Sequence, residues 1–207
     1  MRVYSSWVPP NQECEIFRDL GIGIVFTPRA RRSPLDGIPW ILDNGAFGSW
    51  MRKSPFDSYR FLRSLRLIPR DHHPDFIVIP DIVAGGRLSF EFSLRWMKRI
   101  GTEFKRYFAV QNGMTYSEIE TVLNLEIDGL FIGGTIEWKI NTAGIWIELA
   151  HDHGKPAHIG RCGPISRIKW AKRIGADSID SGSWARNGNR RKTLIRVKQI
   201  AESKVEG

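Results

Sequence analysis

Asp180 lies where a short apolar segment gives way to a Gly/Ser turn, in the sequence S-I-D-S-G-S-W. A carboxylate at the exposed end of a buried strand is a common way to build a reactive site, because the strand positions a side chain that the turn leaves accessible. The alternative is an Asp that caps a helix or stabilises a turn. We predict that Asp180 is a nucleophile.

The same arrangement recurs along the chain. Other polar or glycine motifs also follow short apolar segments: Asp43 in L-D-N-G-A-F, Asp81 in I-P-D-I-V, Gln111 in V-Q-N-G, Gly133 and Gly134 in I-G-G-T, and Arg161 in I-G-R-C-G. If the segments are parallel strands of one barrel, their ends meet at one rim. We therefore expect all these residues to face one cavity, together with Asp180.

Short β-rich segments alternate with segments of helical period, which is typical of βα units around a parallel sheet. Eight strands are predicted, over residues 3–4, 22–26, 40–43, 76–79, 107–110, 130–132, 156–159 and 178–180. Helices are predicted over residues 12–20, 54–67, 88–100, 115–125, 139–151, 164–173 and 190–203. The basic segment 27–37 contains two prolines and is predicted to be a surface loop.

Two of these helices have specific start signals. Ser54 followed by Pro55 places an N-cap residue before a proline at the first helical position, which predicts a helix from there to about Leu67. Thr115 with Glu118 three residues later has the pattern of a capping box.

The fold class predicted from this pattern is α/β. Eight strands, each followed by a helix or by a loop in a helix's place, predict a compact (β/α)8 TIM-type barrel, with residues 1–207 as a single domain. Such barrels typically contain about 250 residues and rarely fewer than about 200, so this one would be minimal. An open, doubly wound sheet is the alternative.

The balance of charge favours an anionic partner. The chain has 31 Lys and Arg against 22 Asp and Glu, a formal net charge of +9, as is common in proteins that bind nucleic acid. Basic clusters are most often solvated surface, but one cluster directly follows Asp180. We predict that it binds nucleic-acid phosphates through Arg186, Arg190, Arg191 and Lys192.

Several classes of protein are disfavoured. No apolar segment approaches the roughly 20 residues of a membrane span, and the N-terminus lacks the apolar core of a signal peptide, so we expect a cytoplasmic protein. Cys14 and Cys162 are too few for a disulfide framework or a Cys-rich zinc site. His151 and His153 have no further ligand at a recognisable spacing and are expected to cap a helix C-terminus. We predict neither a metal nor a cofactor.

The strand-end motifs together resemble those of the tRNA-guanine transglycosylase superfamily, most closely its DNA-acting branch, the 7-deazaguanine DNA transglycosylases (DpdA). The resemblance extends from about Trp40 to Gly188. The family's F-D-C-V-x-P-T-R…R-N-G motif resembles I-D-S-G-S-W-A-R-N-G, which implies that Asp180 is the nucleophile. Its D-S-G-G-[FY]-Q motif resembles D-N-G-A-F, which implies that Asp43 is a general acid/base and that Phe47 stacks on the purine.

The remaining motifs imply how the purine is held. Asp81 matches a strand-end Asp that recognises the aminopyrimidine edge, and Gln111 matches the family's V-Q-G motif, which contacts the purine O6 and the 7-substituent. The family's G-G-L motif implies backbone contacts to the base from Gly133 and Gly134. Its M-G-V-G segment closes the other face of the purine and resembles I-G-R-C-G, which implies that Ile159 is the lid.

Two departures from the family bear on the substrate. The C-x-C-x-x-C…H zinc site is absent and few residues follow Asp180, so we expect a barrel without a zinc subdomain. That region helps the tRNA enzymes to dock their substrate, so its absence favours DNA. Arg161 matches no residue with a role in the family.

The resemblance implies an enzyme that replaces guanine in DNA by a 7-deazaguanine, such as a preQ0-like base, through a covalent intermediate between an aspartate and the sugar. The target base must leave the duplex to react, and a helper protein that opens the duplex is compatible with the sequence. Three alternatives remain: exchange in tRNA, hydrolysis by a purine N-glycosidase, and a nucleic-acid-binding barrel without catalysis.

Overall fold

The computed structural model describes residues 1–30, 34–185 and 189–203. Eight parallel strands close into a barrel in sequence order, with the last strand paired to the first. The strands are β1 (Arg2–Ser5), β2 (Gly23–Phe26), β3 (Trp40–Leu42), β4 (Ile77–Val78), β5 (Arg106–Val110), β6 (Gly129–Ile132), β7 (Ala157–Ile159) and β8 (Ser178–Ser181). The predicted (β/α)8 barrel is confirmed, and the open sheet is wrong.

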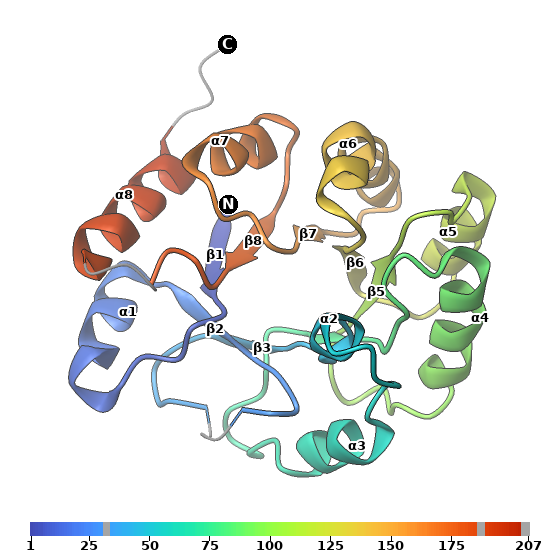
Figure 1. Ribbon diagram of the computed structural model, residues 1–207, viewed down its shortest axis with the longest axis horizontal. Helices are drawn as coiled ribbons and strands as arrows, with labels where there is room; N and C mark the ends of the chain where they lie inside the picture. The colour runs from blue at the N-terminus through green and yellow to red at the C-terminus, as the bar shows by residue number, and fades with distance from the viewer. Residues whose placement is uncertain (31–33, 186–188, 204–207) are drawn as a thin grey trace.

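Helices surround the strands in an outer ring (Figure 1). They are η1 (Asn11–Glu13), α1 (Cys14–Leu20), α3 (Ser58–Arg66), α4 (Gly86–Met97), α5 (Tyr116–Leu123), α6 (Ile136–Asp152), α7 (Ile165–Arg173) and α8 (Arg190–Glu202). After β2 the described part of segment 27–37 is irregular, as predicted. Within the described ranges, no helix has both the length and the apolar character that a bilayer crossing requires.

The region after β3 differs from the prediction. A short helix, α2 (Ala46–Met51), follows the Asp43-Asn44-Gly45 turn and lies inside the outer ring (Figure 1). The next helix, α3, begins at Ser58 with Asp57 as its N-cap, and the Asp57 side chain accepts from the Arg60 amide. The predicted start at Ser54 is wrong, because the chain needs the residues between Arg52 and Asp57 to turn from one helix into the next.

Two apolar layers hold the barrel together. One fills the space between strands and helices; the other fills the barrel interior and consists of Tyr4, Val25, Ile41, Phe76, Val78, Tyr107 and Ala109. Tyr4 pairs in register with Gly23, where a Cβ would overlap the tyrosine ring, and Tyr107 faces Gly129 in the same way. Glycine on the neighbouring strand therefore makes room for each large ring inside a narrow barrel.

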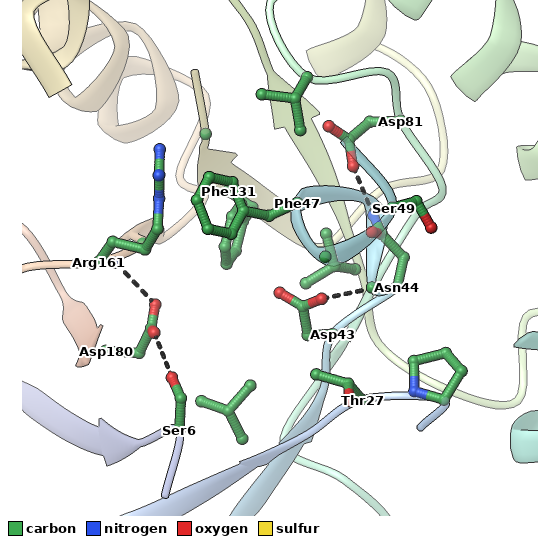
Figure 2. Close-up of a pocket in the computed structure, with 18 of the residues that line it drawn as sticks. Ser6, Thr27, Asp43, Asn44, Phe47, Ser49, Asp81, Phe131, Arg161 and Asp180 are labelled. Atoms are coloured by element: carbon green, nitrogen blue, oxygen red, sulfur yellow. Dashed lines mark hydrogen bonds between the residues drawn. The ribbon is translucent and has the colours of Figure 1, made fainter. Parts of the chain in front are cut away.

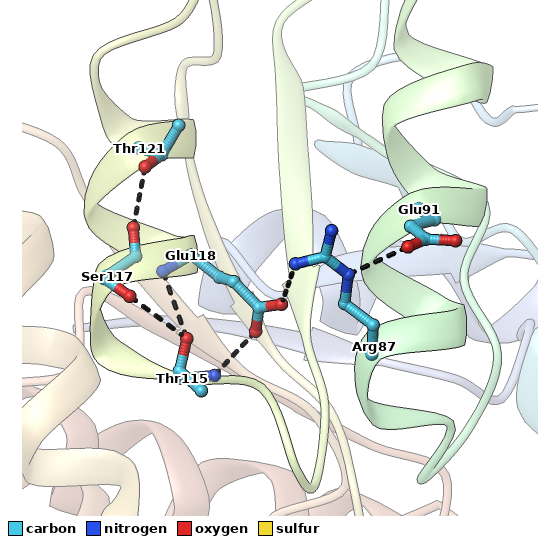
Figure 3. Close-up of polar contacts among 6 residues, drawn as sticks. All are labelled: Arg87, Glu91, Thr115, Ser117, Glu118 and Thr121. Carbon is cyan, nitrogen blue, oxygen red and sulfur yellow. Dashed lines mark hydrogen bonds and ion pairs between the residues drawn. The ribbon is translucent and has the colours of Figure 1, made fainter.

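The capping box predicted at Thr115 is confirmed (Figure 3). The Thr115 hydroxyl accepts from the Glu118 amide at 3.3 Å, and the Glu118 carboxylate accepts from the Thr115 amide at 2.8 Å. The same carboxylate pairs with Arg87 on α4, which also pairs with Glu91. The cap therefore also ties the start of α5 to its neighbour α4.

We expect Thr115→Ala to lower the free energy of unfolding by about 1 kcal/mol, because loss of the hydroxyl leaves a helix N–H without its acceptor. Chemical denaturation of both proteins measures this difference. Thr121→Ala is the matched control, since its hydroxyl donates to the Ser117 carbonyl inside the same helix and caps no amide (Figure 3). Equal destabilisation by the two substitutions would contradict a capping role for Thr115.

Candidate active site

A cavity of about 360 Å³ opens at the C-terminal ends of the strands. That volume is near the lower end of the range for small-molecule sites, about 300 to 1,000 Å³. Figure 2 shows side chains from several strand ends around it. Most residues predicted from strand-end motifs line it: Asp43, Phe47, Asp81, Gln111, Gly133, Gly134, Arg161 and Asp180.

Asp180 is placed by the alternation of β8. Ser178 and Asp180 face the barrel interior, whereas Ile179 between them is buried in the layer under the helices. The Arg161 amide and His158 Nε2 donate to Asp180 Oδ1 at 3.0 and 3.2 Å. The Ser6 hydroxyl donates to Oδ2 at 2.8 Å (Figure 2).

These three hydrogen-bond donors favour the ionised form of Asp180. Burial alone would raise the pKa of its carboxyl, but the hydrogen bonds from His158, Ser6 and the Arg161 amide hold that pKa below its usual value. Asp180 is therefore ionised across the neutral range. A buried carboxylate with its lone pairs only partly used can act as a nucleophile or stabilise positive charge.

Asp43 differs from Asp180 in its electrostatics. Burial of the carboxyl raises its pKa to about 6; the Asp180 charge adds to this shift, and the hydrogen bond from the Gly45 amide opposes it. That amide donates to Asp43 Oδ1 at 2.6 Å, at the start of α2. Figure 2 shows Asp43 and Asp180 on opposite sides of one open space. Asp43 can therefore exchange a proton near neutral pH.

Asp81 lies deeper, 4% exposed, between two side-chain amides. Asn44 Nδ2 donates to its Oδ1 at 2.6 Å, and Gln111 Nε2 donates to its Oδ2 at 2.5 Å. Both amides have a fixed orientation, because their carbonyl oxygens accept from the backbone amides of Ala46 and Ala84. Burial nevertheless raises the pKa of Asp81 to about 7. The carboxyl keeps spare acceptor positions for a ligand.

The two glycines after β6 lie where neighbouring side chains leave no space for a Cβ. A Cβ on Gly133 would overlap Gln111 Nε2, and Gly134 has a φ of 70°, in the left-handed region that favours glycine. Both residues line the cavity, as predicted. Glycine at these two positions therefore leaves room for the side chains of Gln111 and Trp138 beside the cavity.

The predicted lid, Ile159, is wrong. Its side chain is fully buried in the layer between strands and helices, because the neighbouring His158 faces the interior and side chains alternate along β7. At this position Gly160 and Arg161 form the cavity wall. The Arg161 guanidinium lies 4.0 Å from the centre of the Phe47 ring and donates to the Gly134 carbonyl. Arg161 therefore covers one face of the ring that was predicted to stack on a base.

Three cavity or near-cavity residues were not predicted as functional. Ser6 directly follows β1, so the strand-end rule that selected the other residues would also have found it. His158 is fully buried, stacks on Phe131 at 4.9 Å between ring centres, and has Ser178 Oγ 2.8 Å from its Nδ1. Lys139 is 3% exposed and lines the cavity; its Nζ donates to the Gly160 carbonyl, and burial lowers its pKa to about 8.

The basic cluster after Asp180 does not line this cavity within the described residues. Arg190 donates to Glu13 at 2.5 Å and lies over the Trp7 ring, so it ties α8 to the N-terminal segment. Arg191 and Lys192 are exposed in the first turn of α8. Arg186 lies outside the described residues. Whether the cluster binds nucleic acid remains a prediction.

The histidines near α6 have structural partners. His153 Nδ1 lies 2.9 Å from the Leu149 carbonyl, and His151 Nε2 lies 2.9 Å from Asp177, which also accepts from the Ala157 amide. Within residues 1–30, 34–185 and 189–203, no three His, Cys, Asp or Glu side chains are grouped so that they could hold a metal ion.

Neither a protein-family model nor a curated protein matches the chain. Among solved structures, the complex of BexX and CysO from Amycolatopsis orientalis contains a chain of similar fold. It is 14% identical in sequence with a TM-score of 0.60, and the match covers 97% of this chain and 86% of that one. At such low identity the similarity extends to the barrel fold alone.

Proposed function

We propose that the protein exchanges a guanine base in DNA for a 7-deazaguanine, with Asp180 as nucleophile and Asp43 as general acid/base. The main support for this proposal is the pair of carboxyl groups of Asp43 and Asp180. Two carboxyls line one cavity, and their environments shift their pKa values in opposite directions. Such a division commonly separates the group that acts as a base or nucleophile from the group that transfers a proton.

In the first half of the proposed reaction, a lone pair of Asp180 forms a bond to C1′ of the target nucleotide. Oδ2 is the better placed oxygen, because it accepts one hydrogen bond, from Ser6, whereas Oδ1 accepts two. The N9–C1′ bond breaks and its electron pair stays with the purine. Protonated Asp43 gives its proton to the departing guanine, and the sugar remains esterified to Asp180.

The second half reverses these events with another base. Ionised Asp43 accepts the N9 proton of the incoming deazaguanine, whose N9 attacks C1′. The bond between C1′ and Asp180 breaks, and the carboxylate regains its electron pair. Two displacements at one carbon retain its configuration, as in retaining glycosidases.

Asp81 is suited to read the purine. A carboxylate has about four acceptor positions, and Asn44 and Gln111 use two of them, so the remaining two can accept from a guanine N1–H and its 2-amino group. Stacking on Phe47 requires that the Arg161 guanidinium leave the ring face that it covers. Arg161 is therefore proposed to move when the base enters.

The substrate is proposed to be DNA. The net charge of +9 suits a polyanion, and the sequence lacks the zinc-binding motif that accompanies tRNA docking in the resembling family. Exchange in tRNA by the same residues is the second candidate, because the proposed chemistry at C1′ is the same for both sugars.

The test is to incubate the protein with a radiolabelled 7-deazaguanine and either single-stranded DNA, duplex DNA or tRNA. We expect label in DNA, together with one equivalent of released guanine for each base incorporated. Label in tRNA alone would replace the DNA assignment by the tRNA one. Guanine release without incorporation would indicate an N-glycosidase, and neither event in any substrate would contradict the proposed chemistry.

A further inference from the structure

A second cavity lies beside the first, between the loop that follows β2 and helix α3. Its volume is about 480 Å³, larger than that of the cavity containing Asp43 and Asp180. Its floor includes the buried side chains of Trp40 and Leu42 on β3. Nothing in the proposed base exchange uses this space.

The two cavities share a wall. Thr27, Pro28, Arg29 and Arg60 line both of them. Figure 2 shows Thr27, one of these shared residues, near Asp43. A ligand that occupies both cavities must therefore cross this wall, which contains Arg29 and Arg60.

The second cavity is positively charged. Arg29, Arg60 and Arg63 line it, and no carboxylate does so among the residues that the structure describes. Asp57 Oδ2 forms ion pairs with both Arg60, at 3.3 Å, and Arg29, at 3.8 Å, so one negative charge faces two positive ones. Arg63 is exposed and has no ion-pair partner within the described ranges. The excess charge favours an anionic group at the shared wall.

The rest of the second cavity is apolar and aromatic. Tyr59 is 76% exposed and Leu67 is 66% exposed, and both line the cavity with Pro28 and Pro34. Exposed aromatic and apolar side chains beside arginines are typical of surfaces that bind single-stranded nucleic acid, where bases stack and phosphates pair with guanidinium groups.

We propose that the second cavity binds the nucleotide next to the target guanine in single-stranded DNA. The flanking base lies against Tyr59 and Leu67, and the phosphate that joins it to the target lies over Arg29 and Arg60. Arg63 contacts the next phosphate. This inference rests on the proposed function, because it takes the occupant of the first cavity to be the target nucleotide.

The test compares two ligands in the Asp180→Asn protein, which prevents covalent trapping. One is deoxyguanosine monophosphate, and the other is a single-stranded DNA trinucleotide with guanine between two thymines and a phosphate at each end, so that a phosphate also lies beyond each flanking base. We expect Tyr59→Ala to reduce the ratio of trinucleotide to mononucleotide affinity by about fivefold or more, as expected for a lost stacking contact. We expect Arg63→Ala to reduce the slope of log affinity against log salt for the trinucleotide by about 0.7, the value for one phosphate contact.

Arg66→Ala is the matched control, because Arg66 is an exposed arginine one turn further along α3 that lines neither cavity. An affinity ratio unchanged by Tyr59→Ala, or equal salt slopes for Arg63→Ala and Arg66→Ala, would overturn the flanking-nucleotide site. Because this assay measures binding alone, failure of base exchange in the wild-type protein would contradict the proposed function without altering the result for the second cavity.

Discussion

Asp180→Asn is expected to abolish base exchange and leave DNA binding in place. The asparagine has the same shape, its Oδ1 can still accept from His158 and the Arg161 amide, and its Nδ2 can donate to Ser6. It has no carboxylate to attack C1′. Removal of the nucleophile lowers the rate of a serine protease about 10⁶-fold, so we expect exchange to fall below detection. Release of guanine under single-turnover conditions measures this loss.

The covalent intermediate gives a second measurement. Wild-type protein mixed with DNA and no incoming base, then denatured, should contain a fraction linked to DNA through Asp180, which mass spectrometry can locate. The asparagine variant should contain none, although it retards the same DNA in a gel. Normal exchange by this variant would remove Asp180 from the mechanism, and a linkage at Asp43 instead would exchange the roles of the two carboxyls.

The barrel was predictable because its strands are short, apolar and separated by helical segments, so that local pattern and global topology agree. The prediction was wrong where neighbouring signals competed. Ser54-Pro55 is a strong helix start signal in isolation. Here α2 ends at Met51, only three residues earlier, and the chain turns before Asp57 caps α3. A six-residue helix after a glycine turn has too little periodicity to be recognised from sequence.

The site was predictable to the extent that it depends on strand ends. Asp43, Asp81, Gln111 and Asp180 lie around one cavity because each is at, or within three residues of, the C-terminal end of a parallel strand. Ile159 was misplaced because successive side chains of a strand point to opposite faces of the sheet. A shift of one residue in the alignment therefore moves a side chain from the cavity to the layer under the helices. The resemblance identified the segment, but it did not determine which of its side chains point into the cavity.

The groups that donate hydrogen bonds to Asp180 were harder to predict. One donor to Asp180 is the backbone amide of Arg161, a residue that the strand-end motifs had already placed at the cavity. The other two donors are Ser6, which directly follows β1, and His158 on β7, and these two strands lie on either side of β8. Only closure of the barrel brings the first strand against the last, so a contact 174 residues apart in sequence depends on the whole fold.

Asp43→Asn is expected to slow guanine release by about 10² to 10⁴-fold, the usual contribution of a positioned proton donor. The asparagine Oδ1 can still accept from the Gly45 amide, so the start of α2 is kept. Unlike Asp180→Asn, this variant retains the nucleophile and should still form the covalent intermediate slowly. Rapid-quench measurement of guanine release separates this step from the capture of the incoming base.

The pH dependence distinguishes proton transfer from a structural role. Release requires Asp180 ionised and Asp43 protonated; the pKa of Asp180 lies below its usual value and that of Asp43 is raised to about 6. The form with ionised Asp180 and protonated Asp43 therefore predominates between these two values. As pH rises above 6, the ionised form of Asp43 accumulates, and the wild-type rate of release should fall about tenfold per pH unit.

Asp43→Asn should remove this fall, because the amide does not titrate. Asp71→Asn is the control, an exposed aspartate outside both cavities that should leave the profile unchanged. Capture of the incoming deazaguanine should show the opposite slope, since it requires ionised Asp43 to accept the N9 proton. If both half-reactions kept the same pH profile in the variant as in the wild type, another group would have to carry the proton, and Asp43 would act only by shaping the cavity.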